Sequence, residues 1–204
     1  RCDAFDIEEG AKVFDLSARR LSTAASRLLC GVLKFNTSLE SVSLVGCGFD
    51  AEGAKALEVA LSVNTSITAL DLSANKIHQS SDGTEALTRA VAVNKRLERI
   101  TLDGPGSELS FKELRTSTHL NLANRRLRLL SGAVVGAVAG SNLSLTDVNL
   151  ENNELGPGGT QAVTMGLSQR PVLKTLNVSD CGLAGSKSWE QLTERSARST
   201  GKED

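Results

Sequence analysis

A short apolar motif returns along this chain at nearly constant intervals, and this spacing limits the possible folds more than any other feature. The motif is a triplet in which two apolar residues flank one variable residue. Its seven copies are Phe14-Asp15-Leu16, Val42-Ser43-Leu44, Leu70-Asp71-Leu72, Ile100-Thr101-Leu102, Leu120-Asn121-Leu122, Val148-Asn149-Leu150 and Leu176-Asn177-Val178. The steps between copies are 28, 28, 30, 20, 28 and 28 residues. Such a period indicates a solenoid, in which each unit buries its apolar residues against its neighbours.

Each unit contains a strand pattern followed by a helix pattern. Apolar and polar residues alternate around the triplet, which places the apolar side chains on one face of a short strand. Asn or Cys lies three residues after four of the triplets, at Cys47, Asn75, Asn153 and Cys181. Its side chain can bond backbone groups where the chain leaves the strand. Helical spacing follows, and we expect Asn36, Asn64, Asn94 and Asn142 to end the helices as left-handed caps.

A longer period groups the units into modules. Residues of the first half have counterparts 106 positions later, as Phe5 has in Phe111. In the last unit of a module, residues 103–118 replace the helix, and Pro105 argues against regular structure at the start of that stretch. We expect one array over residues 1–204 that is an excerpt of a longer one. Its parts are the end of an upstream linker (1–12), a first module (13–118), an incomplete second module (119–188), and a C-terminal helix with a frayed tail (189–204).

The units resemble ribonuclease-inhibitor-type leucine-rich repeats, which read L-x-x-L-x-L-x-x-N/C-x-L and include a complete helix. The resemblance covers roughly residues 12–188. Such repeats occur in ribonuclease inhibitor, NOD-like receptors and the Ran GTPase-activating protein. The resemblance implies an α/β solenoid curved as a horseshoe, with a concave parallel sheet of about seven short strands, helices on the convex side, and a ligand on the sheet or the adjoining loops. Arg19 and Arg125 depart from the pattern at the Asn/Cys position.

The candidate binding residues are the polar ones between and beside the strand aliphatics. They are Asp15, Asp71, Arg99, Thr101, Asp103, His119, Asn121, Asp147, Asn149, Glu151 and Asn177. Acids outnumber bases on this predicted face, so it could dock a basic patch or peptide of another protein, with charge raising the encounter rate. The same residues could simply keep an exposed sheet soluble, and no Trp or Tyr anchor lies among them. Trp189 is expected to cover the last unit or, alternatively, to anchor a partner.

Composition and motifs exclude several function classes. The formal net charge is −1, which gives no overall attraction to nucleic acid or an anionic membrane. The longest apolar run, Leu129 to Gly140, is too short to span a bilayer. No zinc motif and no nucleophile with a base at a recognisable spacing occurs, so we expect no metal, no cofactor and no enzymatic activity. We expect a protein-interaction scaffold. The alternative is a GTPase-activating protein resembling the Ran regulator, although no diagnostic catalytic residue of that family aligns.

The cysteines and the sequons bear on the cellular compartment. Cys47 and Cys181 lie five units apart, which at about 4.8 Å per strand exceeds the reach of a disulfide, so we expect free thiols. Four N-x-S/T sequons begin at Asn36, Asn64, Asn142 and Asn177. Three of them arise where the helix-to-strand turn requires Asn. The sequence therefore favours a reducing, cytoplasmic location.

Overall fold

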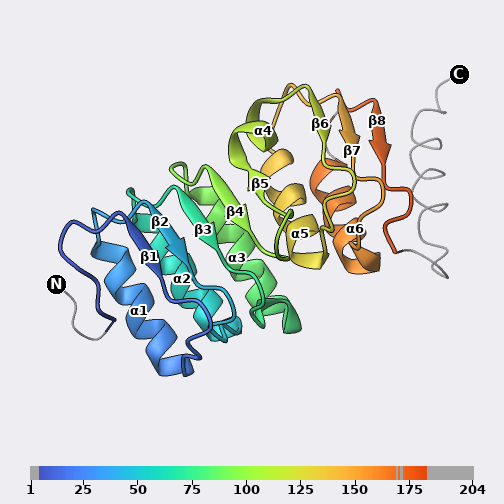
Figure 1. Cartoon of the computed structure of the whole chain (residues 1–204). Helices are drawn as coiled ribbons and strands as arrows, with labels where there is room; N and C mark the ends of the chain where they lie inside the picture. Colours follow the sequence, from blue (N-terminus) through green and yellow to red (C-terminus); the bar gives the residue numbers. More distant parts are fainter. Residues whose placement is uncertain (1–4, 169, 171, 183–204) are drawn as a thin grey trace, which may run out of the picture.

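The computed structural model of the chain describes residues 5–168, 170 and 172–182, and these form an α/β solenoid with strands along one side and helices along the other (Figure 1). The elements in chain order are β1 (Val13–Asp15), α1 (Thr23–Phe35), β2 (Ser41–Ser43), α2 (Ala51–Val63), β3 (Ala69–Asp71), the 3₁₀ helix η1 (Ile77–Gln79), α3 (Ser81–Val93), β4 (Arg99–Thr101), β5 (Leu109–Ser110), α4 (Phe111–Thr116), β6 (His119–Asn121), α5 (Leu129–Ala139), β7 (Asp147–Asn149), α6 (Gly156–Leu167) and β8 (Thr175–Asn177). The C-terminal helix expected at residues 189–204, with Trp189, lies outside the described residues.

Strands β1 to β4 pair in parallel and in chain order, with equivalent repeat positions opposite one another. Phe14 pairs with Val42, Val42 with Leu70, and Leu70 with Ile100. These residues are buried between the strands and the helices, and so is Leu72, two positions after Leu70. The predicted alternation of buried and outward-facing residues is therefore confirmed for these strands, and it sets which side chains can meet another molecule.

The predicted single sheet of about seven parallel strands is wrong. One sheet has five strands in the order β1-β2-β3-β4-β5, and a second has three in the order β6-β7-β8. Strand β5 runs antiparallel to β4, with Leu109 opposite Ile100. The unit that begins at β4 has only 20 residues, too few for a full helix, and the chain turns back through Gly104 and Gly106, both at positive φ. Strand β5 thereby takes the edge of β4 that β6 would otherwise join.

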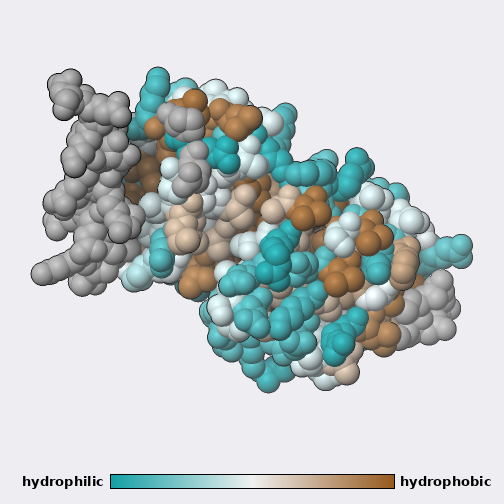
Figure 2. All heavy atoms as spheres, turned by 180° about the vertical axis from the view of Figure 1, so that it is seen from behind, coloured by the Kyte–Doolittle hydropathy of each residue, from teal (hydrophilic) through white to brown (hydrophobic). Residues whose placement is uncertain are grey.

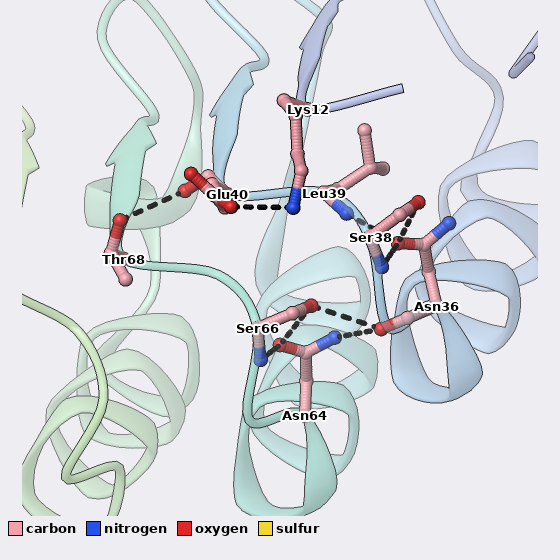
Figure 3. A network of polar contacts seen from close by, with 8 residues as sticks. All are labelled: Lys12, Asn36, Ser38, Leu39, Glu40, Asn64, Ser66 and Thr68. Atoms are coloured by element: carbon pink, nitrogen blue, oxygen red, sulfur yellow. Dashed lines mark hydrogen bonds and ion pairs between the residues drawn. The ribbon is translucent and has the colours of Figure 1, made fainter. Parts of the chain in front are cut away.

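The helix-to-strand turns are held together by the side chains of asparagines, but not as left-handed caps. Asn36, Asn64 and Asn94 have extended backbones, with φ of −73°, −65° and −66°. The Asn64 amide donates to the carbonyl oxygens of Leu33 (2.7 Å) and Asn36 (2.9 Å) in the preceding unit. Its oxygen accepts from backbone N–H groups of its own turn. The turns therefore lie side by side along one edge of the solenoid (Figure 3).

A second set of side chains joins the units where each strand ends. The Asn75 amide donates to the carbonyl oxygens of Leu44 and Leu72, both at 2.8 Å, and its oxygen accepts from the Phe49 N–H. Cys47 makes the thiol version of this contact, donating to the Leu16 carbonyl oxygen at 3.0 Å. This confirms the predicted role of the Asn/Cys position. The left-handed residues of each unit lie beside it, at Ala18, Gly46, Ala74, Gly104, Asn124, Asn152 and Asp180.

Helices α5 and α6 pack unusually closely because glycines line their contact. Gly132, Gly136 and Gly140 recur at four-residue intervals along the α5 side that meets α6. A Cβ on Gly132 would lie 2.9 Å from the Gly159 carbonyl oxygen, and one on Gly136 would overlap the carbonyl oxygen of Ala162. The apolar run Leu129 to Gly140 is thus a helix buried on nearly every side. No helix in the described ranges is long and apolar enough to cross a membrane.

Candidate functional site

The candidate binding residues lie on the outward strand face, as predicted from their alternation, but the break between the sheets divides them. The five-stranded sheet carries Asp15, Asp71, Arg99 and Thr101, with Asp103 just after β4, and the three-stranded sheet carries His119, Asn121, Asp147, Asn149 and Asn177, with Glu151 just after β7. Within each sheet, register brings equivalent residues side by side: Asp71 lies opposite Thr101, and Asp147 lies between His119 and Thr175. The face therefore consists of two adjoining surfaces.

The middle column of this face has a local structural role that the sequence reading missed. Asp15 accepts a hydrogen bond from the Ser17 N–H at 2.8 Å, and Asp71 accepts one from the Ser73 N–H at the same distance. The equivalent bonds at Asn121, Asn149 and Asn177 measure 3.2, 3.1 and 3.0 Å. Each is an Asx turn that guides the chain out of the strand, which explains why Asp or Asn recurs there. The signal in the sequence was the recurrence of Asp or Asn at five of the seven triplets, with Ser43 and Thr101 at the other two.

A polar cluster surrounds Asp147 on the second sheet. Its carboxylate accepts from the Thr146 and Thr175 hydroxyls, both at 2.6 Å, and lies 3.3 Å from His119 Nε2. Thr118 Oγ1 is 2.9 Å from the other ring nitrogen of His119. The two threonine hydroxyls are the main cause of the lowered pKa of Asp147. Because each carboxylate oxygen already accepts one hydrogen bond, Asp147 offers less to a partner than its charge suggests.

Two other candidate binding residues already have bonding partners near the break between the two sheets. Arg99 forms a long ion pair with Glu108 (Nε to Oε2, 3.9 Å), in which both side chains are mostly exposed. Asp103 accepts a 2.7 Å hydrogen bond from the backbone N–H of Arg128, which begins the helical part of the next unit. Asp103 therefore joins the two sheets. Within the described residues no basic side chain lies within ion-pair distance of Asp15, Asp71, Asp103 or Glu151, and of these four Asp103 and Glu151 are bonded to a neighbouring unit.

The loops that leave the second sheet border a shallow, open pocket of about 550 Å³. Its lining residues are Asn124, Arg126, Asn152, Asn153, Glu154, Gly156, Asp180 and Gly182. Arg126 and Arg125 form an arginine pair, and Arg19 and Arg20 form the equivalent pair 106 residues earlier. The pairs are not equally placed: Arg19 lies 3.9 Å from Asp6, whereas Arg125 donates to the Glu108 carbonyl oxygen. In the described part of the chain, His, Cys, Asp and Glu side chains form no group of three suited to a metal.

The comparisons with known proteins agree with the repeat assignment. A family model described as "Leucine Rich repeat" matches residues 35–57, 63–80 and 141–163. The "Capping protein, Arp2/3 and myosin-I linker protein 3" of Rattus norvegicus is 30% identical over 179 residues, covering 79% of this chain and 13% of the relative. The "Ribonuclease inhibitor" of Mus musculus is 27% identical over 187 residues, covering 91% of this chain and 36% of the relative. The chain thus spans a minor part of the length of these curated relatives.

Among solved structures, "Leiomodin-1 Actin-Binding Site 2 (ABS2)" aligns over 91% of this chain and 88% of that chain, with a TM-score of 0.47 and 18% sequence identity. The repeat period, the parallel strands with buried aliphatics, the Asn/Cys bonds at the strand ends and the family and sequence matches lead to one assignment. The chain is a leucine-rich-repeat protein of the ribonuclease-inhibitor type.

Proposed function

We propose that this chain is a protein-interaction module that presents its outward strand face and the adjoining loops to another protein. The observation that carries the proposal is the alternation along the strands. Residues such as Phe14 and Leu72 are buried, whereas the polar residues between them, such as Asp15 and Asp71, face outward on a surface that no element of the described chain covers. A relative whose name describes a linker of capping protein, Arp2/3 and myosin-I supports a protein as the partner class.

The geometry of the two layers supports a concave shape for this face. Neighbouring strands of a sheet lie about 4.8 Å apart, whereas helices need about 10 Å each. An array with one strand and one helix per unit is therefore expected to bend toward its strands, as in a horseshoe. The break between β5 and β6 supports a division into a first module over 13–118 and a second that starts at 119. The partner would then meet two surfaces at an angle.

The unpaired acids favour a partner that presents basic side chains. Asp15 and Asp71 stand two strands apart at equivalent positions, at opposite sides of Ser43. Two strand spacings correspond to about 10 Å, a separation that lysines three residues apart can match on a peptide in the polyproline-II conformation, which repeats every three residues and rises about 3.1 Å per residue. Complementary charge of this kind raises the association rate and makes it sensitive to salt. Asp15 and Asp71 can be replaced by Asn without loss of their Asx turns, because Asn makes the same turn at the equivalent position in the second sheet.

The test uses a fluorescein-labelled peptide with lysine at every third position and serine between. A chain carrying both Asp15→Asn and Asp71→Asn is expected to bind it about fivefold more weakly, as two exposed charge pairs of about 0.5 kcal/mol each imply. The matched control carries Glu52→Gln and Glu85→Gln on the helix layer, which changes the net charge equally. If both variants weaken binding to the same extent, or if the unmodified chain does not bind at physiological salt, the proposed face is wrong.

A further inference from the structure

A second surface of the molecule combines exposed apolar and basic side chains. It consists of the three successive turns that follow α1, α2 and α3, at residues 34–38, 62–66 and 92–96, and we call it the turn edge. These turns are neighbours in space, because the Asn64 amide bonds the Asn36 carbonyl oxygen at 2.9 Å (Figure 3). The Asn94 amide likewise reaches the carbonyl oxygen of Asn64 at 3.4 Å. The turn edge lies where each helix leads into the next strand, so it is a different surface from the outward strand face (Figure 1).

One apolar side chain projects from each turn at the same repeat position. The exposed fractions are 74% for Phe35, 50% for Val63 and 60% for Val93. Each residue directly precedes the asparagine of its turn, so the bonds between the asparagines hold the three side chains in a row. Hydrophobic residues reach the surface in separate patches over the helix layer of this half of the molecule (Figure 2). An exposed apolar side chain at the same position of three successive units is a repeated feature, unlike the single scattered apolar residues of an ordinary surface.

The charged residues of the turn edge all have one sign. Its fifteen residues include Lys34, Lys95 and Arg96 and contain no Asp or Glu. None of these three cations forms an ion pair with a described acid: Lys95 Nζ donates to the Ala92 carbonyl oxygen, and Arg96 Nε donates to that of Thr65. Helix C-termini favour cations, which accounts for the basic residues. It does not account for an exposed Phe and two exposed valines at equivalent positions.

The surroundings of Phe35 make the two ends of the turn edge differ in charge. A pocket of about 330 Å³ adjoins it, lined by Ile7, Glu8, Glu9, Gly10, Val32, Phe35, Asn36, Thr37 and Ser38. Glu8 and Glu9 bring negative charge to this end beside Lys34, whose Nζ lies 5.2 Å from the Phe35 ring centroid, whereas Lys95 and Arg96 make the opposite end basic. An anionic bilayer would be repelled by the two glutamates, and a single row of apolar side chains offers a bilayer little area. A protein segment can complement both ends, because its sequence can carry a basic residue at one position and acidic residues at another.

We propose that the turn edge docks an amphipathic helical segment of a partner protein, with apolar residues along Phe35, Val63 and Val93 and acidic residues toward Lys95 and Arg96. An apolar stripe at i, i+3, i+4 and i+7 fits a straight row of side chains, which is how helices commonly bind to hydrophobic surfaces. The proposal concerns a different surface from the strand face, so it stands or fails independently of the function proposed above.

The probe is a fluorescein-labelled helical peptide with leucines along one face and glutamates beside them, and its counterpart has lysines in place of the glutamates. We expect the glutamate peptide to bind and the lysine peptide to bind at least ~tenfold more weakly. Val63→Ser and Val93→Ser should each weaken binding of the glutamate peptide about tenfold, because each removes most of the burial of one valine side chain. Lys95→Glu with Arg96→Glu should reverse the preference between the two peptides.

Val13→Ser is the matched control, because Val13 is a similarly exposed valine on the strand face and its change should leave binding unaffected. All of these side chains are exposed, so thermal unfolding should stay within a degree or two of the unmodified chain. The proposal is overturned if the glutamate peptide does not bind, if Val13→Ser weakens it as much as Val63→Ser does, or if phosphatidylserine vesicles bind the chain and the peptide does not.

Discussion

Arg115 donates a 2.7 Å hydrogen bond from Nη2 to the backbone carbonyl oxygen of Asn94. In the regular units this carbonyl is bonded by the asparagine of the next unit, as Asn64 bonds that of Asn36. The short unit has no such asparagine, and an arginine on the short helix α4 takes its place. Arg115 also reaches the carbonyl oxygens of Leu97 and Val91, and its guanidinium lies 4.8 Å from the Phe111 ring centroid.

Replacing Arg115 should therefore weaken the attachment of α4 to the turn that follows α3. Arg115→Met keeps an apolar stem against Phe111 but removes the charged donors, and we expect it to cost about 2 kcal/mol of unfolding free energy. Arg115→Lys should cost less, because an ammonium group can still reach one carbonyl oxygen. Denaturant unfolding monitored by circular dichroism measures both. Equal stability of the methionine variant and the unmodified chain would contradict the role assigned to the arginine.

Two glycines in helices should respond in opposite ways to the same change. Gly136→Ala adds a methyl group where the backbone of α6 already touches α5, and we expect a loss of about 3 kcal/mol. Gly31→Ala adds the same group on α1, where nothing lies within 4 Å, and should gain about 0.5 to 1 kcal/mol from helix propensity. Thermal unfolding of the two variants tests the close helix contact, and a stable Gly136→Ala variant would rule it out.

Substitutions at two neighbouring residues, the last residue of β3 and the one after it, should differ sharply in their effect on stability. Leu72 is buried between the layers, and Leu72→Asp should unfold the array because it places an unpaired charge in the core. Asp71 faces outward but accepts the hydrogen bond of its Asx turn, so Asp71→Ala should cost only about 0.5 to 1 kcal/mol. Asp71→Asn keeps the acceptor and should leave stability unchanged. Chemical denaturation of all three checks which side faces the core, and similar losses for the first two would mean that the register is wrong.

Stability in acid should depend on the cap of α2. The carboxylate of Asp50 accepts from the Gly53 N–H at 3.0 Å, and this bond is the main cause of its pKa falling below the ordinary 3.8. A pKa lower in the folded than in the unfolded chain gives stability that is present above 3.8 and is lost as the pH falls through the folded value. Asp50→Asn keeps the cap but cannot titrate, so its unfolding free energy should fall less steeply below that pH. Parallel curves for the two chains would contradict this.

The buried thiols should be protected in the folded chain. Burial raises the pKa of Cys30 to about 12, and desolvation also raises the pKa of Cys47 and Cys181. Since the thiolate is the reactive form, these three should react with iodoacetamide only as fast as the array unfolds. Mass spectrometry of the alkylated peptides, with and without denaturant, measures the rates. Rapid labelling of Cys47 without denaturant would show that its bond to Leu16 is not maintained.

The repeat by itself determined which residues are buried. Phe14 and Leu72 could be assigned to the core, and Asp15 and Asp71 to the outer face, because each unit must bury its aliphatics between neighbours and strand alternation settles the rest. The Asn/Cys bonds at the strand ends followed from the same reasoning. These features are local in the sequence and recur in every unit, so each copy reinforces the prediction.

Only the tertiary structure decided how the units meet where the period changes. The two residues of β5 form no pattern of their own, and their antiparallel pairing with β4 depends on the chain reversing after a strand that the next unit does not join. The replacement of an asparagine by Arg115, and the row formed by Phe35, Val63 and Val93, likewise depend on bonds between turns about 20 to 30 residues apart. Such contacts follow from packing between units, which residue spacing alone does not specify.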